Sequence, residues 1–173
     1  MKLIIITGKQ CAGKTTLANF MQYFHDCEKL DNNAESGVSA IEKFEYGYHY
    51  EEVTDEETGE VCNQMVIDKA SLGVLGIETP TEDKNYVCIA RPQQIAPLRA
   101  LYDCFVVWME TDNNIIRKMR YIGDGNFDNE IFGIIDSVER QEFKNMDFDF
   151  KMANRSELDL QNRKEILDFL SLN

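Results

Sequence analysis

The sequence predicts an α/β fold in which helices cover both faces of a parallel central sheet. Three observations lead to this prediction. The first apolar run, Leu3 to Thr7, is continuous and rich in β-branched residues, as expected of a strand buried on both faces. A glycine-containing loop and a helical pattern follow it directly. Further short apolar runs then alternate with helical patterns, which is the order typical of parallel strands joined by crossover helices.

The individual elements can be taken in chain order. Apolar residues, Leu17, Phe20, Met21 and Phe24, recur at helical spacing from Lys14 to about His25, which predicts a helix there. Alternating apolar residues on either side of Glu57-Thr58-Gly59 predict a β-hairpin or a small meander. The later strands are predicted at Tyr86 to Ala90, Cys104 to Met109 and Phe148 to Met152. The later helices are predicted at Pro92 to about Leu101, Asn113 to Tyr121, about Asn129 to Phe143, and Glu157 to Leu170.

Composition restricts the class of protein. The 173 residues match the length of one compact domain. The net charge of -13, without a basic patch, argues against binding to nucleic acid or to an anionic membrane. The five cysteines form no CxxC pair, which argues against a disulfide framework or a zinc site and favours a cytoplasmic location. The start MKLIIIT lacks the pattern of a signal peptide, and no apolar run is long enough to span a bilayer.

The segment GKQCAGKT, Gly8 to Thr15, matches the P-loop pattern G-x-x-x-x-G-K-[ST] and lies between the first strand and the first helix. Its glycines let successive N–H groups turn toward phosphate oxygens, and the start of the helix adds a positive dipole end. Lys14 is expected to meet the terminal phosphates and Thr15 to ligate Mg²⁺. The predicted phosphate-binding residues are Gly8, Lys9, Gln10, Cys11, Ala12, Gly13, Lys14, Thr15 and Thr16.

The motif makes the predicted fold that of a P-loop NTPase, with three α/β/α layers around a parallel central sheet. It does not by itself distinguish a kinase from a switch or a motor. No N-K-x-D signature of a GTPase is present. Cys11, inside an electropositive loop, is either a reactive thiol of lowered pKa or a small residue that fills the loop.

From about Asn85 onward the order of elements resembles the guanylate kinase type of nucleoside monophosphate kinase. DCFVVWMETDNNIIRKMRYIGDG is similar to that family's strand, helix and basic lid. EIFGIIDSVERQEF is similar to its second lid helix, and FDFKMANRSELD to its last strand and adenine-side loop. The resemblance implies a single domain, residues 1–173, with a small β-rich acceptor-binding segment at about 31–80 and a helical lid at about 113–143.

The resemblance also implies roles for individual residues. Lys14 with Arg117, Arg120 and Arg140 would be catalytic, closing on the transferred phosphoryl group, with ATP as co-substrate and Mg²⁺ as cofactor. The alternative is that Arg117 and Arg120 are solvated helix arginines and that Arg140 belongs to a surface ion pair. Asn154 would lie on the adenine side. Tyr50, in GYHYEEVTDEE, would contact the acceptor phosphate or else be a core tyrosine.

The middle of the chain departs from the family pattern. The stretch SGVSAIEKF, where the family has arginines, contains none. Arg91 stands where the family has an acidic residue that helps to hold hydrated Mg²⁺. It would either bind the acceptor phosphate or form a structural ion pair. Asp68 and Glu110, each after a predicted strand, are candidate replacements for the missing acidic residue.

The expected function is transfer of the γ-phosphoryl group of ATP to a nucleoside or deoxynucleoside monophosphate. Two alternatives remain open at this point. One is a P-loop kinase of another small acceptor, hydroxylated or cationic, which the acidic middle segment favours. The other is a regulatory protein that binds nucleotide without catalysis. The expected partners are small-molecule nucleotides, and the sequence specifies neither the acceptor nor the oligomeric state.

Overall fold

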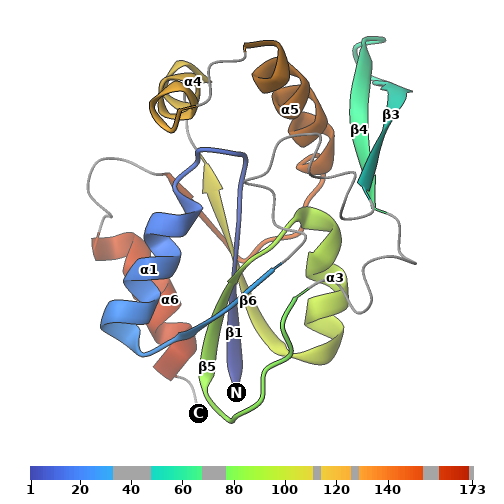
Figure 1. The fold of residues 1–173 in the computed structure, drawn as a ribbon. Helices are drawn as coiled ribbons and strands as arrows, with labels where there is room; N and C mark the ends of the chain where they lie inside the picture. Colours follow the sequence, from blue (N-terminus) through green and yellow to red (C-terminus); the bar gives the residue numbers. More distant parts are fainter. Residues whose placement is uncertain (33–47, 68–76, 111–113, 126–128, 154–159, 172–173) are drawn as a thin grey trace.

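A computed structural model of the chain describes residues 1–32, 48–67, 77–110, 114–125, 129–153 and 160–171. Its main sheet has five strands in the order β2-β5-β1-β6-β7, and all neighbouring strands are parallel (Figure 1). The strands are β1 (Lys2–Thr7), β2 (Glu28–Leu30), β5 (Asn85–Ile89), β6 (Asp103–Glu110) and β7 (Phe150–Ala153). The predicted α/β class with a parallel central sheet is therefore confirmed.

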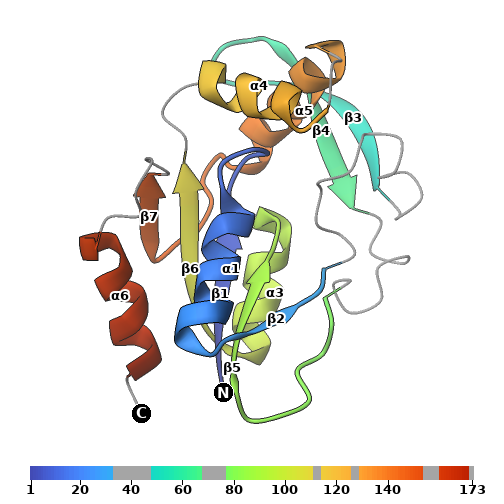
Figure 2. The ribbon, with the colours of Figure 1, turned by 60° about the vertical axis from the view of Figure 1, so that its left-hand side comes forward.

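Helices lie on both faces of this sheet and above one end of it. They are α1 (Lys14–His25), α3 (Pro92–Leu101), α4 (Asn114–Gly123), α5 (Asn129–Glu142) and α6 (Leu160–Ser171). Helices α1 and α6 cover one face and α3 covers the other (Figure 1). Helices α4 and α5 lie beyond the carboxyl ends of β1 and β6, over the loop that follows β1 (Figure 2). None of the helices in the described ranges is long and apolar enough to cross a membrane.

The centre of the sheet is apolar on both faces because β1 sends alternate side chains in opposite directions. Ile4 and Ile6 belong to the cluster that includes Leu17 and Met21 of α1. Leu3 and Ile5 belong to the cluster that includes Ile95 and Leu98 of α3. These four side chains of β1 are at most 1% exposed, so the strand forms a rigid base for the loop that begins at Gly8.

The predicted hairpin is a separate two-stranded antiparallel sheet, β3 (Tyr48–Thr54) and β4 (Val61–Ile67), and it lies beside α5 (Figure 1). Asp55 closes its turn, because its Oδ1 accepts hydrogen bonds from the N–H groups of Glu57 (2.8 Å) and Thr58 (3.2 Å). The Nε2 group of Gln141 on α5 donates to Oδ2 of the same carboxylate at 3.2 Å. One acidic side chain therefore both shapes the turn and attaches the hairpin to α5.

Two features differ from the sequence prediction. Strand β2 was not predicted, because three residues with an exposed Glu28 are too short to show alternation. Phe24 belongs to the apolar pattern that predicts α1 but is 71% exposed, and its ring packs on Phe20, with centroids 4.8 Å apart. The last turn of α1 thus contributes little to the main core.

Candidate functional site

The loop from Gly8 to Thr15 connects the carboxyl end of β1 to the first turn of α1. Its backbone has positive φ angles, which favour glycine, at Gly8 (155°), Cys11 (62°) and Gly13 (95°). A Cβ atom on Gly8 would lie 2.3 Å from the backbone oxygen of Met109, in the neighbouring strand β6. Glycine is therefore required at Gly8 both by its conformation and by the close approach of β6.

The N-terminus of α1 opens into this loop. The N-cap is Gly13, which provides no side-chain cap, and the first backbone bond is from Leu17 N–H to the oxygen of Gly13 (3.3 Å). The N–H groups ahead of Leu17 have no acceptor within the helix, and the helix dipole adds partial positive charge there. This arrangement is suited to an anion.

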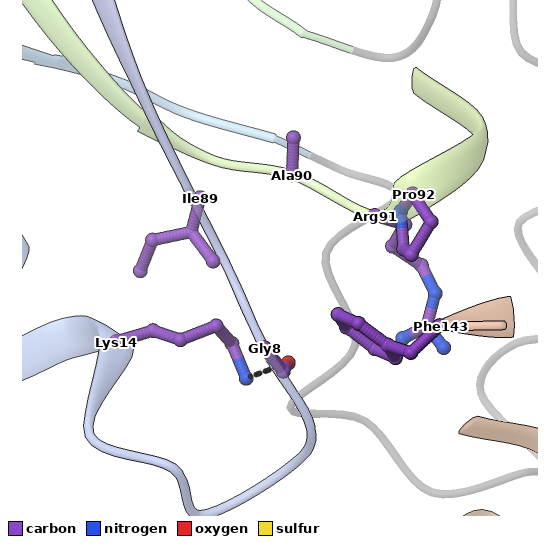
Figure 3. Close-up of a pocket in the computed structure, with 7 residues that line it drawn as sticks. All are labelled: Gly8, Lys14, Ile89, Ala90, Arg91, Pro92 and Phe143. Carbon is purple, nitrogen blue, oxygen red and sulfur yellow. Dashed lines mark hydrogen bonds between the residues drawn. The ribbon is translucent and has the colours of Figure 1, made fainter. Parts of the chain in front are cut away.

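Lys14 lies across the same loop. Its Nζ group donates hydrogen bonds to the backbone oxygens of Gly8 (2.8 Å) and Lys9 (2.9 Å), and Figure 3 shows the side chain reaching Gly8. Thr15 and Thr16 follow in the first helical turn, and both are exposed. A cation, helix N–H groups and an accessible hydroxyl therefore occur within a few residues of each other.

Helices α4 and α5 contact the tip of the loop. Arg117 Nε donates to the backbone oxygen of Gln10 at 2.9 Å, and Arg120 Nη1 donates to that of Cys11 at 3.0 Å. From α5, Glu139 Oε1 accepts from the backbone N–H of Gln10 at 2.7 Å. The structure thus brings two of the three predicted lid arginines to the glycine-containing loop.

The environments of the three arginines differ. Arg117 is 1% exposed and donates to Asp136 Oδ1 (2.6 Å) and to Glu139 Oε2 (3.0 Å). Arg140 is 55% exposed, and among the described residues it lies 3.5 Å from Asp136 Oδ2 and 4.0 Å from Glu60. Burial opposes ionisation of Asp136, but the hydrogen bond from Arg117 and the charges of Lys9, Arg117 and Arg140 outweigh it and lower the pKa of that carboxyl.

Cys11 is half-buried and packs as a small apolar residue. Its side chain lies against the cluster of Tyr121, Phe132 and Ile135, which belong to α4 and α5. Burial, followed by the negative charge of Asp124, raises the pKa of the Cys11 thiol despite the opposing charges of Lys14 and Arg117. Of the two interpretations from sequence, the structural one is favoured, since the thiol is neutral near neutral pH.

Arg91, at the end of β5, forms a buried ion pair with Glu142 of α5. Its Nε donates to Glu142 Oε2 at 3.0 Å, and the two side chains are 7% and 0% exposed. A cavity of about 10 Å³, room for about one water molecule, lies between this pair and the loop. Figure 3 shows its lining, with Lys14 and Gly8 on one side and Arg91 and Phe143 on the other.

A larger hollow, about 430 Å³, lies elsewhere. It is lined by residues of α3 and of the segment that follows α5, including Pro92, Ile95, Arg99, Lys144 and Met146. The Nε of Arg99 pairs with Asp147 at 3.2 Å, and its Nη2 pairs with Asp149 at 2.8 Å. We centre the candidate site on the smaller cavity because that cavity adjoins the cations and the helix terminus.

Four predicted residues remain, and Glu110 is the one among them whose side chain the structure describes. Glu110 ends β6 and pairs with Lys151 at 2.8 Å. Asp68 and Asn154 lie outside the described residues, and Tyr50 is described only as part of the backbone of β3. The described ranges contain no group of three or more His, Cys, Asp or Glu side chains that could hold a metal ion.

Sequence reasoning missed the three carboxylates that organise this region. Asp136, Glu139 and Glu142 recur every three residues along α5, and as whole residues they are 9%, 2% and 7% exposed. They flank the apolar stripe that contains Ile135 and Val138, so they lie at the edge of the buried face. Their spacing could have identified them from sequence. Acidic residues that recur beside a buried apolar stripe are candidates to pair with the arginines assigned to the same site.

No family model matches the chain, and no curated protein matches it.

Proposed function

We infer that this chain is an ATP-dependent P-loop phosphotransferase of the nucleoside monophosphate kinase type. The observation that carries this proposal is the combination of an α1 N-terminus without a side-chain cap and Lys14 lying across the preceding loop. In that arrangement the N–H groups at the start of α1 would hold the β- and γ-phosphates of ATP. Lys14 would exchange its two carbonyl acceptors for phosphate oxygens.

The proposed chemistry is positioning and electrostatic stabilisation. Arg120 and Arg140 are better able than Arg117 to turn toward a transferring phosphoryl group, since Arg117 is buried, Arg120 is half-buried and Arg140 is exposed. A guanidinium can hold two of the oxygens on which charge develops. No covalent intermediate with the protein is required.

Thr15 is the residue that would ligate Mg²⁺. The ion usually takes only one or two protein ligands and completes its shell with water and substrate phosphates, so a single exposed hydroxyl beside Lys14 fits it. Bound with ATP, Mg²⁺ would neutralise part of the charge on the β- and γ-phosphates. The carboxylates nearest the loop, Asp136 and Glu139, are already paired with Arg117.

A second candidate function has a specific observation in its favour. Glu142 neutralises the charge of Arg91 inside the protein, so a dianionic acceptor would have to compete with a buried carboxylate. This favours an acceptor without a phosphate group, such as a hydroxylated or cationic small molecule. The two candidates share the ATP site and differ only in the acceptor.

The test begins with MgATP binding, measured by calorimetry. Turnover is then measured with each ribo- and deoxynucleoside monophosphate and with a panel of hydroxylated and cationic small molecules. Turnover on a monophosphate supports the first candidate, and turnover only on the other panel supports the second. Binding of ATP without turnover on any acceptor would favour a nucleotide-binding regulator, and absence of ATP binding would refute the proposal.

The role of Arg91 can be tested with the double variant Arg91→Met, Glu142→Met. It removes both buried charges, whereas changing either residue alone would leave one charge unpaired at a cost of about 3 to 5 kcal/mol. If a monophosphate is the acceptor and Arg91 binds it, we expect its KM to rise at least about tenfold while the KM for ATP stays unchanged. An unchanged acceptor KM would leave Arg91 with only a structural role.

The proposed roles of Arg120 and Arg140 predict an effect on kcat that is larger than the effect on ATP binding. Replacing either with Ala should lower kcat severalfold, a change of about 1 kcal/mol, and weaken ATP binding less, because these contacts would form fully only in the transition state. The measurement is kcat beside the dissociation constant for ATP, with Lys164→Ala on α6 as a control. Normal kcat in both arginine variants would remove α4 and α5 from the proposed chemistry.

A further inference from the structure

Both polar groups of the Gln10 backbone are held by one pair of side chains. The oxygen of Gln10 accepts from Arg117 Nε at 2.9 Å, and its N–H donates to Glu139 Oε1 at 2.7 Å. Arg117 Nη2 and Glu139 Oε2 join to each other at 3.0 Å and so close a ring. We call Gln10, Arg117 and Glu139 the Gln10 ring.

Both side chains that hold Gln10 are buried, whereas Gln10 itself is half-buried. Arg117 is 1% exposed and Glu139 is 2% exposed, and Arg117 is held further by Asp136 Oδ1 at 2.6 Å. The guanidinium also lies 5.5 Å from the centre of the Phe132 ring. Removing one partner from such a cluster leaves an uncompensated buried charge, so Arg117 is poorly placed to leave it for a phosphate group.

The residue after Gln10 explains why the ring would be needed. Cys11 has a φ of 62°, a left-handed conformation that is costly for residues other than glycine. Such a conformation persists when the surroundings fix it. Here the Gln10 ring fixes the preceding residue, Arg120 holds the oxygen of Cys11 at 3.0 Å, and the thiol packs between α4 and α5.

We propose that Arg117 and Glu139 are positioning residues that hold the loop in its phosphate-binding conformation before nucleotide arrives. This rests on the proposed function, since it concerns the same ATP site. ATP then binds without the cost of ordering the tip of the loop. Arg117 acts through the Gln10 backbone and does not touch phosphate, unlike Arg120 and Arg140.

The test compares ATP binding by three variants at a temperature at which calorimetry or circular dichroism shows each to be folded. Glu139→Gln keeps the side-chain length and an acceptor for Gln10 N–H but removes the charge that pairs with Arg117. Arg117→Lys keeps a positive charge but removes the Nε donor to Gln10. It is included so that the inference can still be tested if Glu139→Gln does not fold. Glu130→Gln, an exposed change on the first turn of α5, is the control.

We expect Glu139→Gln and Arg117→Lys each to weaken MgATP binding by about threefold to tenfold, with a smaller change in kcat and no change in the control. The double variant should lose less affinity than the product of the two single losses, because both act through Gln10. A purely structural role would lower the melting temperature and leave the ATP affinity of the folded protein unchanged.

Three outcomes would overturn the inference. Unchanged ATP affinity in the folded variants would show that the ring does not position the loop. Tighter binding by Glu139→Gln would show that the carboxylate competes with phosphate. Wild-type protein that does not bind ATP would overturn the proposed function itself, and the inference with it.

Discussion

Lys14→Ala is expected to leave the protein folded and to weaken ATP binding or turnover at least about tenfold, which corresponds to about 1.4 kcal/mol or more. In the absence of nucleotide the ammonium group donates hydrogen bonds to the backbone oxygens of Gly8 and Lys9. Its removal exposes those oxygens to water at little cost. Its charge would matter only when phosphate enters the loop.

The measurement is an ATP titration beside a thermal unfolding curve. Lys164→Ala makes the same chemical change at an exposed position on α6 and should alter neither. An unchanged ATP titration in Lys14→Ala would remove the loop from the functional proposal. A collapse of the melting temperature would instead assign Lys14 to the fold.

Gly8→Ala is expected to have the largest effect on stability. The added methyl group would meet the oxygen of Met109 at 2.3 Å, and this oxygen belongs to the backbone of a central strand that cannot easily move. The φ of 155° adds conformational strain. Together these predict a loss of about 3 kcal/mol or more in the free energy of unfolding, or displacement of the loop with loss of ATP binding.

Gly133→Ala provides the matched control. Gly133 lies within α5, and a Cβ atom built on it has no neighbour within 4 Å among the described atoms. This substitution should stabilise the protein by up to about 1 kcal/mol, because alanine favours the helix over glycine. Chemical denaturation of both variants gives the comparison, and equal stability of Gly8→Ala and wild type would contradict the close approach of β6 to the loop.

The sequence was most informative where its pattern was local and strong. A continuous apolar run predicts β1, and Pro92 at the start of a helical pattern predicts α3, because proline suits the first turn of a helix. The loop between β1 and α1 follows from its glycine and lysine spacing. These predictions needed no knowledge of distant contacts.

The sequence was least informative about partners brought together by the fold. Arg91 and Glu142 are 51 residues apart and lie on different elements. The sequence around either residue therefore does not indicate that the two charges neutralise each other. Arg117 is similarly placed in a lid by the resemblance to the guanylate kinase type. Its burial depends on Asp136 and Glu139, which a pattern confined to α4 cannot reveal.

Helix α5 contacts three places that are separate in the sequence. Glu139 reaches the loop after β1, Glu142 reaches Arg91 at the end of β5, and Gln141 reaches Asp55 in the hairpin. A helix is stiff along its length, so a ligand that shifts α5 at one contact changes the free energy of the other two. Thermodynamic linkage requires this coupling to be reciprocal, so a molecule that binds more tightly once ATP is present must tighten ATP binding by the same factor.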